Sequence, residues 1–290
     1  MIARRRVAFL TLHDPTGFVI DDDLAIEPLA RRGVAVETLP WDRPGVDWRH
    51  YNLVVVRSTW DYQHHADRFL ATLAAIEQSG TPLHNSLAIT RWNIQKTYLR
   101  DLAARGVPTV PTLWRERLKP GGLLPLFDEL RCEQAVIKPV MSGNAQGAWR
   151  LDRASAAAQA AEIEAYYADR TLMMQPFERG ILAEGEFSLI YFNGALSHSI
   201  LKVPKRGDFR VQEEHGADIL AVTAEPALHA AGAAAIKAIG ERLLYARVDL
   251  VRHADEFRVM ELELIEPAIY LRMDPGAPDR FADAVTSLIA

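Results

Sequence analysis

Cysteine is nearly absent from this chain of 290 residues, which contains one, Cys132. A single cysteine excludes an intrachain disulfide, and a reducing compartment is the simplest expectation. No stretch reaches the roughly 18 apolar residues that a membrane-spanning helix needs. The apolar run at residues 7–12 is broken too early, by His13-Asp14-Pro15, to be a signal peptide. We therefore expect a cytoplasmic protein without a membrane partner.

An excess of positive charge is also missing. The 33 Lys and Arg are outnumbered by 38 Asp and Glu, which gives a formal net charge of −5 and no support for a nucleic-acid partner. The sequence lacks the Gly-Lys-Ser/Thr ending of a P-loop, the Rossmann glycine fingerprint and internal repeats. With 49% hydrophobic and 24% charged residues, the composition is that of a globular protein with room for more than one core.

Strands and helices are expected to alternate in the first third of the chain. Apolar runs at 7–11, 34–39 and 53–57 predict strands, and helical spacing at 24–32 and 66–78 predicts helices. This alternation predicts a small parallel α/β domain over residues 1–92. Ligands of such sheets bind beyond the carboxyl ends of the strands, where the third strand is followed by Arg57-Ser58-Thr59-Trp60-Asp61-Tyr62.

The later chain has a different pattern, with strands that follow one another closely and pair antiparallel. We expect one subdomain at 93–178 and another at 179–290. The first should contain a helix at 93–105, a strand at 109–113 and a hairpin at 135–151. The second should contain strands joined by the Asn193-Gly194 turn and a last hairpin at 246–264. The whole is predicted to be an α/β domain followed by an α+β region.

The last hairpin carries the most informative residues. Side chains two apart on a strand share a face, so Arg247 and Asp249 point one way, as do Glu261 and Glu263. A turn centred near Asp255 would pair Asp249 with Glu261 and bring three carboxylates together, while Met260, Leu262 and Leu264 face a core. Oxygen ligands without Cys or His suit Mg²⁺. The competing interpretation is an amphipathic hairpin with a solvated polar face.

Lys138 ends an apolar strand and precedes a loop of small residues, Ser142 to Gly147. Glycines let backbone N–H groups approach phosphate oxygens, and a nearby Lys supplies the opposite charge. A flexible hairpin tip beside a surface Lys would give the same pattern.

Two further segments have a possible ligand role. The apolar strand that ends at Gln175, before Phe177, could form a flat slot for a base, although a strand leaving the core at Pro176 is the simpler explanation. The basic run from Lys202 to Arg210 could neutralise phosphate or carboxylate groups, although such runs are usually solvated.

The order of these segments resembles the ATP-grasp superfamily, over roughly residues 93–271. The resemblance implies two antiparallel sheets that sandwich ATP, with phosphates held by Lys96, Lys138 and the loop residues Ser142, Gly143, Asn144 and Gly147. It also implies an adenine hinge at Gln175 and Phe177, a ribose contact at Glu186, and one or two Mg²⁺ ions on Asp249, Glu261 and Glu263. Arg247, Arg210 and Lys202 are the expected catalytic residues.

The family usually has Asn at the last metal position, where this chain has Glu263 followed by Leu264-Ile265-Glu266-Pro267. This ending and the 57–62 loop look most like the cycloserine-synthetase subgroup, which closes O-ureido-serine into a ring. More distantly, the chain resembles glutathione-synthetase-like and ribosomal-protein-modifying ligases. The implied activity is that of an ADP-forming carboxylate–amine ligase with an acyl-phosphate intermediate. The expected contacts of its amino-acid-like substrate are Arg57, Ser58, Thr59, Asp61, Tyr62 and Arg210.

Two alternatives stay open on the sequence alone. A kinase on the same fold would leave the phosphate on a non-carboxylate acceptor, and a regulator would bind ATP without turnover. A homodimer is the ordinary expectation for the assembly.

Overall fold

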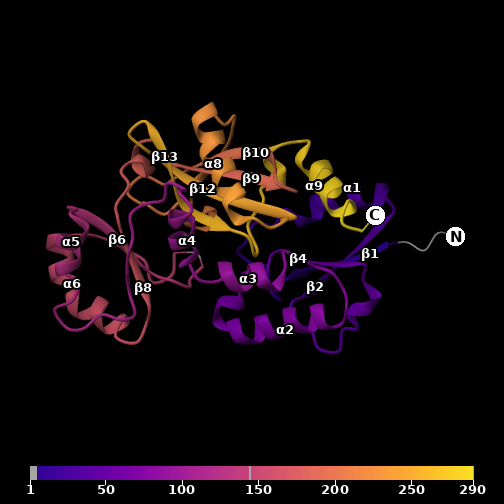
Figure 1. Cartoon of the computed structure of the whole chain (residues 1–290), viewed down its shortest axis with the longest axis horizontal. Coiled ribbons are helices and arrows are strands. Elements are labelled where there is room, and N and C mark those ends of the chain that lie inside the picture. The colour runs from indigo at the N-terminus through magenta and orange to yellow at the C-terminus, as the bar shows by residue number, and fades with distance from the viewer. Residues whose placement is uncertain (1–4, 144, 290) are drawn as a thin grey trace.

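The computed structural model describes residues 5–143 and 145–289. Its first sheet is parallel throughout and has the strand order β2-β1-β3-β4. The strands are β1 (Arg5–Thr11), β2 (Val34–Pro40), β3 (Leu53–Val56) and β4 (Leu83–His84). The predicted α/β character of the N-terminal region is therefore confirmed, and Figure 1 shows this region beside the C-terminal end of the chain.

Both faces of this sheet are buried, which explains why its strands are continuous apolar runs. On one face, Ala8 and Leu10 pack with Phe69 and Leu73 of α2 (Ala66–Gln78). On the other, Val7 packs in the cluster that contains α1 (Ile26–Arg31) and the last helix, α9 (Ala277–Thr286). The C-terminal helix thus covers the N-terminal sheet (Figure 1).

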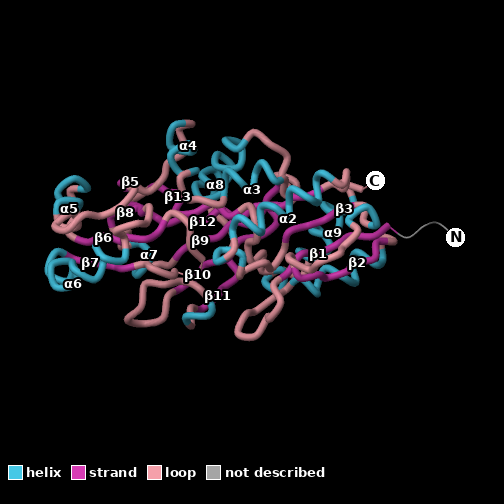
Figure 2. The backbone as a smooth tube through the Cα atoms, turned by 90° about the horizontal axis from the view of Figure 1, so that it is seen from below, coloured by secondary structure: helices cyan, strands magenta, loops and turns pink. Residues whose placement is uncertain are grey.

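The second sheet is antiparallel, with the order β5-β8-β6-β7. Its strands are β5 (Leu113–Arg115), β6 (Gln134–Pro139), β7 (Trp149–Asp152) and β8 (Leu172–Pro176). Ala135 and Ile137 pack against α5 (Pro125–Leu130) and α6 (Arg153–Tyr166), which lie at the end of the molecule far from both termini (Figure 2). The alternate residues Val136 and Lys138 therefore point to the opposite face.

The third sheet is also antiparallel, with the order β11-β10-β9-β12-β13. Its strands are β9 (Glu186–Phe192), β10 (Ala195–Val203), β11 (Asp218–Val222), β12 (Tyr245–His253) and β13 (Glu256–Glu263). Val248 and Leu250 pack on the side of α8 (Pro226–Ile239), so Arg247 and Asp249 project from the other face. The two antiparallel sheets of the predicted ATP-grasp fold are thus present.

Shorter elements complete the described part of the chain. They are the α-helices α3 (Leu87–Asn93), α4 (Tyr98–Ala104) and α7 (Gly180–Ala183), and the 3-10 helices Asp22–Ala25, Trp48–His50, Tyr62–His64, Glu213–His215 and Leu271–Met273. In the described residues, every helix is too short or too polar to cross a bilayer.

Two local predictions were wrong. The helix expected at 93–105 begins only at Tyr98, as α4. The chain breaks between α3 and α4 where the Asn93 side chain bonds the backbone of β13, at Leu262 O (2.9 Å) and Leu264 N (2.9 Å). The break places Lys96 beside the glycine loop, where its N–H donates to Val140 O at 2.7 Å. The strand expected at 109–113 begins only at Leu113, since Pro111 has no N–H to donate to a ladder.

Candidate active site

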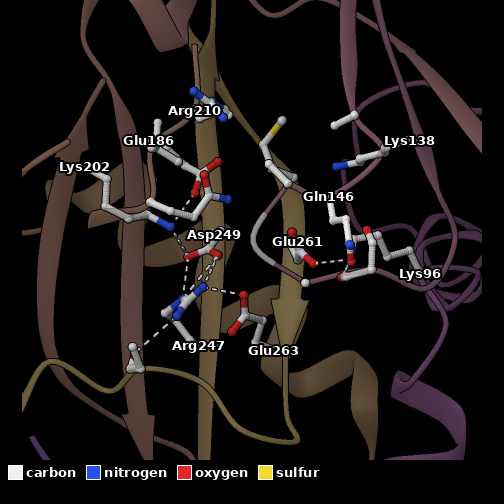
Figure 3. Close-up of a pocket in the computed structure, with 18 of the residues that line it drawn as sticks. Lys96, Lys138, Gln146, Glu186, Lys202, Arg210, Arg247, Asp249, Glu261 and Glu263 are labelled. Atoms are coloured by element: carbon white, nitrogen blue, oxygen red, sulfur yellow. Dashed lines mark hydrogen bonds and ion pairs between the residues drawn. The ribbon is translucent and has the colours of Figure 1, made fainter. Parts of the chain in front are cut away.

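A cavity of about 660 Å³ lies where the three sheets meet. It is lined by many side chains that the sequence marked as candidates: Tyr62, Lys96, Lys138, Ser142, Gly143, Gln175, Phe177, Glu186, Lys202, Arg210, Arg247, Asp249, Glu261 and Glu263. Figure 3 shows Lys96 and Lys138 on one side of this space and Glu186, Lys202, Arg247 and Asp249 on the other.

The predicted pairing of Asp249 with Glu261 is present, but a β-bulge produces it. The hairpin turn lies at Ala254-Asp255, so that Leu250 pairs with Val259, and the register then shifts by one residue before Asp249 meets Glu261. A bulge places two successive residues of one strand opposite a single partner. Met260 consequently lines the cavity beside Glu261, and it is only partly buried against the apolar cluster of Val110, Ile181, Val211 and Val251.

Each of the three hairpin carboxylates has a cationic partner. Asp249 is buried between Arg247 (Nη2 to Oδ2, 2.9 Å) and Lys202 (Nζ to Oδ1, 3.3 Å). Arg247 also bonds Glu263, and Lys96 lies 2.9 Å from Glu261 (Figure 3). Like charges that close would otherwise suppress one another's ionisation. The cations therefore keep an acidic cluster stable inside the fold.

The acidities of these groups differ sharply. Burial opposes ionisation of Asp249, but Arg247 and then Lys202 outweigh it and lower its pKa to about 2. Burial likewise opposes ionisation of Glu261, yet Lys96 and Lys138 lower its pKa. Glu263 is the exception, since burial raises its pKa to about 7 in spite of Arg247. The carboxylate that departs from the usual family pattern is therefore the least acidic of the three.

The donor set fits Mg²⁺ held jointly by protein and phosphate. Among residues 5–143 and 145–289, no three acidic, His or Cys side chains come close enough together to hold an ion by themselves. Mg²⁺ is normally bound by one or two carboxylates and completed by water and substrate phosphates. Asp249, Glu261 and Glu263 present only oxygen donors to the cavity, which satisfies that requirement.

Lys138 and Lys96 both line the cavity on the side of the glycine loop (Figure 3). Lys96 donates to Ser142 O at 3.0 Å. In the described structure, Lys138 has no carboxylate within ion-pair distance, and burial lowers its pKa. A desolvated cation without a counterion favours an anionic ligand. This part of the cavity is thus suited to phosphate.

Several residues of the glycine loop line the cavity, among them Ser142, Gly143 and Gln146, whereas Gly147 anchors the loop. Gly143 lies in the lining, whereas Gly147 does not, contrary to its expected phosphate contact. Gly147 has φ +69°, and a Cβ there would come within 2.4 Å of Tyr166 Oη, so glycine is needed for backbone and packing reasons. Its carbonyl accepts a bond from Tyr167 at 2.6 Å. Asn144 lies outside the described residues.

The expected adenine hinge borders a less polar part of the cavity. Phe177 lies there with Ile181 and Met260. The Gln175 side chain is buried, and its amide donates to Thr112 Oγ1 at 3.0 Å. An apolar slot with few polar groups is typical of a site for a flat ring.

The basic residues and Glu186 are held by ion pairs. Lys202 is buried and pairs with Glu186 (2.5 Å) as well as with Asp249. Arg210 is partly exposed and forks onto Asp208, with Nη2 at 2.7 Å from Oδ2. Lys202 is therefore fixed within the site, whereas Arg210 lies on its rim.

Most side chains of the loop after β3 do not line the cavity, contrary to the expectation that they contact substrate. Arg57, Ser58 and Thr59 are buried, and they and Asp61 are absent from the lining. Arg57 Nε donates to Asp22 at 3.0 Å, and Trp41 donates to Asp61 at 2.6 Å. Of the loop residues expected to contact substrate, Tyr62 alone lines the cavity. The others are placed to support the fold.

The cavity is also lined by residues that the sequence did not mark as site residues, among them Trp60, Gln63, Met260 and Glu266. Trp60 and Gln63 lie in or next to the loop already noted, but a 3-10 turn decides which of its side chains face inward. In the sequence, Glu266 was noted only as part of the ending, after Glu263, that departs from the usual family pattern.

Known proteins resemble this chain over nearly all of its length. The family model described as the D-cycloserine synthetase DcsG N-terminal domain matches residues 7–85. The cycloserine biosynthesis protein DcsG of Streptomyces lavendulae is 31% identical over 295 aligned residues, which cover 94% of this chain and 95% of that protein. The crystal structure of D-cycloserine synthetase DcsG has 29% identity and a TM-score of 0.85, with 98% and 100% of the chains covered. D-alanine–D-alanine ligase of Bacillus anthracis shares the fold, at 14% identity and a TM-score of 0.71, with 98% and 97% covered.

Proposed function

Since this chain belongs to the family of D-cycloserine synthetase DcsG and is an ATP-grasp ligase, we propose that it closes O-ureido-serine into cycloserine at the expense of ATP. The observation that carries this proposal is the full-length likeness, which includes the N-terminal region that contributes Trp60, Tyr62 and Gln63 to the cavity. Those residues adjoin the carboxylate cluster, where substrate and ATP must meet.

ATP is proposed to bind between the two antiparallel sheets. Its adenine would lie against Phe177, Ile181 and Met260, and its phosphates between Lys138 and Lys96. Asp249, Glu261 and Glu263 would hold one or two Mg²⁺ ions, whose bound charge offsets the negative charge that develops during phosphoryl transfer. Glu186 and Gln175 are proposed as the ribose and base contacts.

The substrate carboxylate is proposed to attack the γ-phosphoryl group, which gives an acyl phosphate and ADP. The nitrogen bonded to oxygen then attacks the acyl carbon and phosphate leaves, while water takes the carbamoyl group as carbamate. Arg247, fixed by Asp249, Glu263 and the carbonyl of Ala268, is positioned to steady the transferring group. Lys202 keeps Asp249 ionised, and Arg210 on the rim would neutralise anions as they enter.

Water must be excluded while the acyl phosphate exists, because hydrolysis competes with ring closure. The glycine loop is already tethered at Ser142 by Lys96, and the Gly143 backbone lies against the Gln63 side chain. We propose that this loop covers the reacting groups. The cytoplasmic location and the homodimer expected from the sequence stay predictions.

The test is ADP release with Mg-ATP and a panel of amino acids that includes both O-ureido-serine enantiomers, with hydroxylamine present to trap an acyl phosphate. Cycloserine from one enantiomer, and hydroxamate in step with ADP, would support the proposal. A stable phosphorylated product without hydroxamate would instead identify a kinase.

A further inference from the structure

Glu266 is a carboxylate of the cavity wall without a cationic partner. It is half-buried, and among the residues that the structure describes no Lys, Arg or His pairs with it. Its contacts are neutral: Gln63 Nε2 lies 3.3 Å from Oε1, and Tyr62 is its second hydrogen-bond partner. The buried carboxylates Glu186 and Asp249 each have a Lys or Arg instead.

The backbone around Glu266 belongs to no helix or strand, but side chains bond each of its carbonyl groups. Six consecutive carbonyls, from residue 264 to residue 269, each lie at hydrogen-bond distance from a side chain. The partners in order are Asn85 (2.7 Å), Tyr245 (2.7 Å), Trp60 (2.7 Å), Arg57 (3.0 Å), Arg247 (3.2 Å) and His198 (2.9 Å). A segment fixed at every carbonyl presents its side chains in a defined geometry.

These bonds indicate that the buried 57–62 loop positions the backbone of the 264–269 segment. Arg57 and Trp60 reach from the N-terminal sheet to Pro267 and Glu266, so they place the backbone that carries the carboxylate. Trp60 also lines the cavity and packs against Phe18, with ring centroids 5.2 Å apart. A carboxylate next to aromatic rings is a favourable surrounding for an organic cation.

The position of Glu266 relative to the reacting groups limits the class of ligand that it could bind. Glu266 follows Glu263 by three residues and lies within electrostatic reach of Glu263 and Lys96. In an α-amino acid the ammonium nitrogen and the carboxyl carbon are attached to the same carbon. A group that binds the ammonium must therefore lie beside the groups that activate the carboxylate, which is where Glu266 lies.

We propose that Glu266 binds the α-ammonium group of the substrate and so selects amino acids over other carboxylic acids. This proposal rests on the proposed ligase function, in which a carboxylate is activated at the cluster. Gln63 and Tyr62 hold the carboxylate in place, and Gln63 also contacts the Gly143 backbone. The ammonium site and the phosphate loop thus share one side chain.

The electrostatics around Glu266 agree with this role. Burial, and then the charge of Glu263, raise the pKa of Glu266 to about 8. An ammonium ligand would supply the missing positive charge and favour the ionised carboxylate.

The test compares O-ureido-serine with its 2-hydroxy analogue in wild type, Glu266→Gln, Glu266→Asp and a control, Glu256→Gln. Glu256 is exposed at the far end of the same hairpin. Gln is close in shape to the protonated carboxyl and can accept the same bond from Gln63. Unfolding midpoints and the Kd for ATP show whether each variant is folded.

We expect wild type to prefer the amino acid, and Glu266→Gln to raise the KM for the amino acid by about 10- to 100-fold, as the loss of one charge-assisted bond would. The KM for the hydroxy analogue should change little. The preference of Glu266→Gln for the amino acid over the hydroxy analogue should therefore be lost, and Glu266→Asp should recover part of it. A preference that survives in Glu266→Gln would overturn the proposal, as would a fall in kcat with an unchanged KM. Cycloserine formation by wild type tests the proposed function separately. If another amino acid is the substrate, the same comparison is made with that acid and its hydroxy analogue.

Discussion

Two groups of the cavity wall, Lys138 and Glu266, lack an ion-pair partner and differ in the sign of their charge. Within the part of the chain that the structure describes, Lys138, proposed to bind phosphate, is a cation without a carboxylate, and Glu266, proposed to bind the substrate ammonium, is a carboxylate without a cation. Asp249, Glu261 and Glu263, in the same cavity, are each matched by Lys or Arg. The paired groups keep the site folded, and the unpaired ones mark where ligand charges of opposite sign belong.

Paired and unpaired charged groups also contribute differently to the stability of the fold. A buried charge without a partner costs stability, whereas the removal of one member of a buried pair leaves the other uncompensated. Mutations of paired and unpaired groups should therefore affect stability in opposite directions.

The largest effect is expected for Glu261→Gln, in the paired middle of the cavity. It removes a proposed metal ligand and the partner of Lys96, 2.9 Å away. Turnover should fall by about a thousandfold or more, as for the loss of a principal electrostatic group in a site. ADP release at saturating Mg-ATP measures it. Glu256→Gln is the matched control, and near-wild-type activity of Glu261→Gln would remove the metal assignment.

Arg57→Ala should act on stability rather than on substrate contact. Arg57 is buried, bonds Asp22 and Pro267, and lies over the Tyr245 ring at 4.8 Å. The substitution leaves Asp22 with Ser58 but without its cationic partner, and it should lower the free energy of unfolding by about 3 kcal/mol. Urea unfolding measures this loss. Arg49→Ala, which breaks an exposed pair with Asp47, should change stability little. An equally small change for Arg57→Ala would contradict the supporting role.

Lys138→Ala tests the unpaired cation. The Kd for ATP should rise by about 10- to 100-fold, since a charge-assisted contact to phosphate is lost. The ATP-free variant should unfold no more readily than wild type, because burial opposes the charge of Lys138 and lowers its pKa. Calorimetric titration and thermal unfolding give the two values, with exposed Lys237→Ala as the control. An unchanged Kd would argue against a phosphate contact.

The sequence was enough to predict Lys138 and the carboxylates Asp249, Glu261 and Glu263 as cavity residues, because they lie on strands whose two-residue period decides the face of each side chain. Lys96 lies on no strand and was expected only from the family resemblance. The sequence did not predict the positions where a strand or helix is interrupted. The bulge at Met260 depends on packing around β13, and the break before Lys96 depends on Asn93 reaching Leu262 and Leu264, far along the chain. The role of Arg57 could not be predicted for the same reason, since its partners come from Asp22 and Pro267.

The smallest expected effect concerns His198 of β10, which contacts the end of the segment that carries Glu266. Its Nε2 donates to Ile269 O at 2.9 Å, and burial lowers the pKa of the ring. A histidine with a lowered folded-state pKa contributes stability that is complete above the unfolded value of about 6.5 and is lost as the pH falls through the folded value. Wild type should therefore lose more stability between pH 7.5 and 5.5 than His198→Gln, whose amide can donate to the same carbonyl at both pH values. The difference is measured as the change in the unfolding midpoint of each protein between the two pH values. Equal pH dependence in the two proteins would mean that the ring does not titrate in this range.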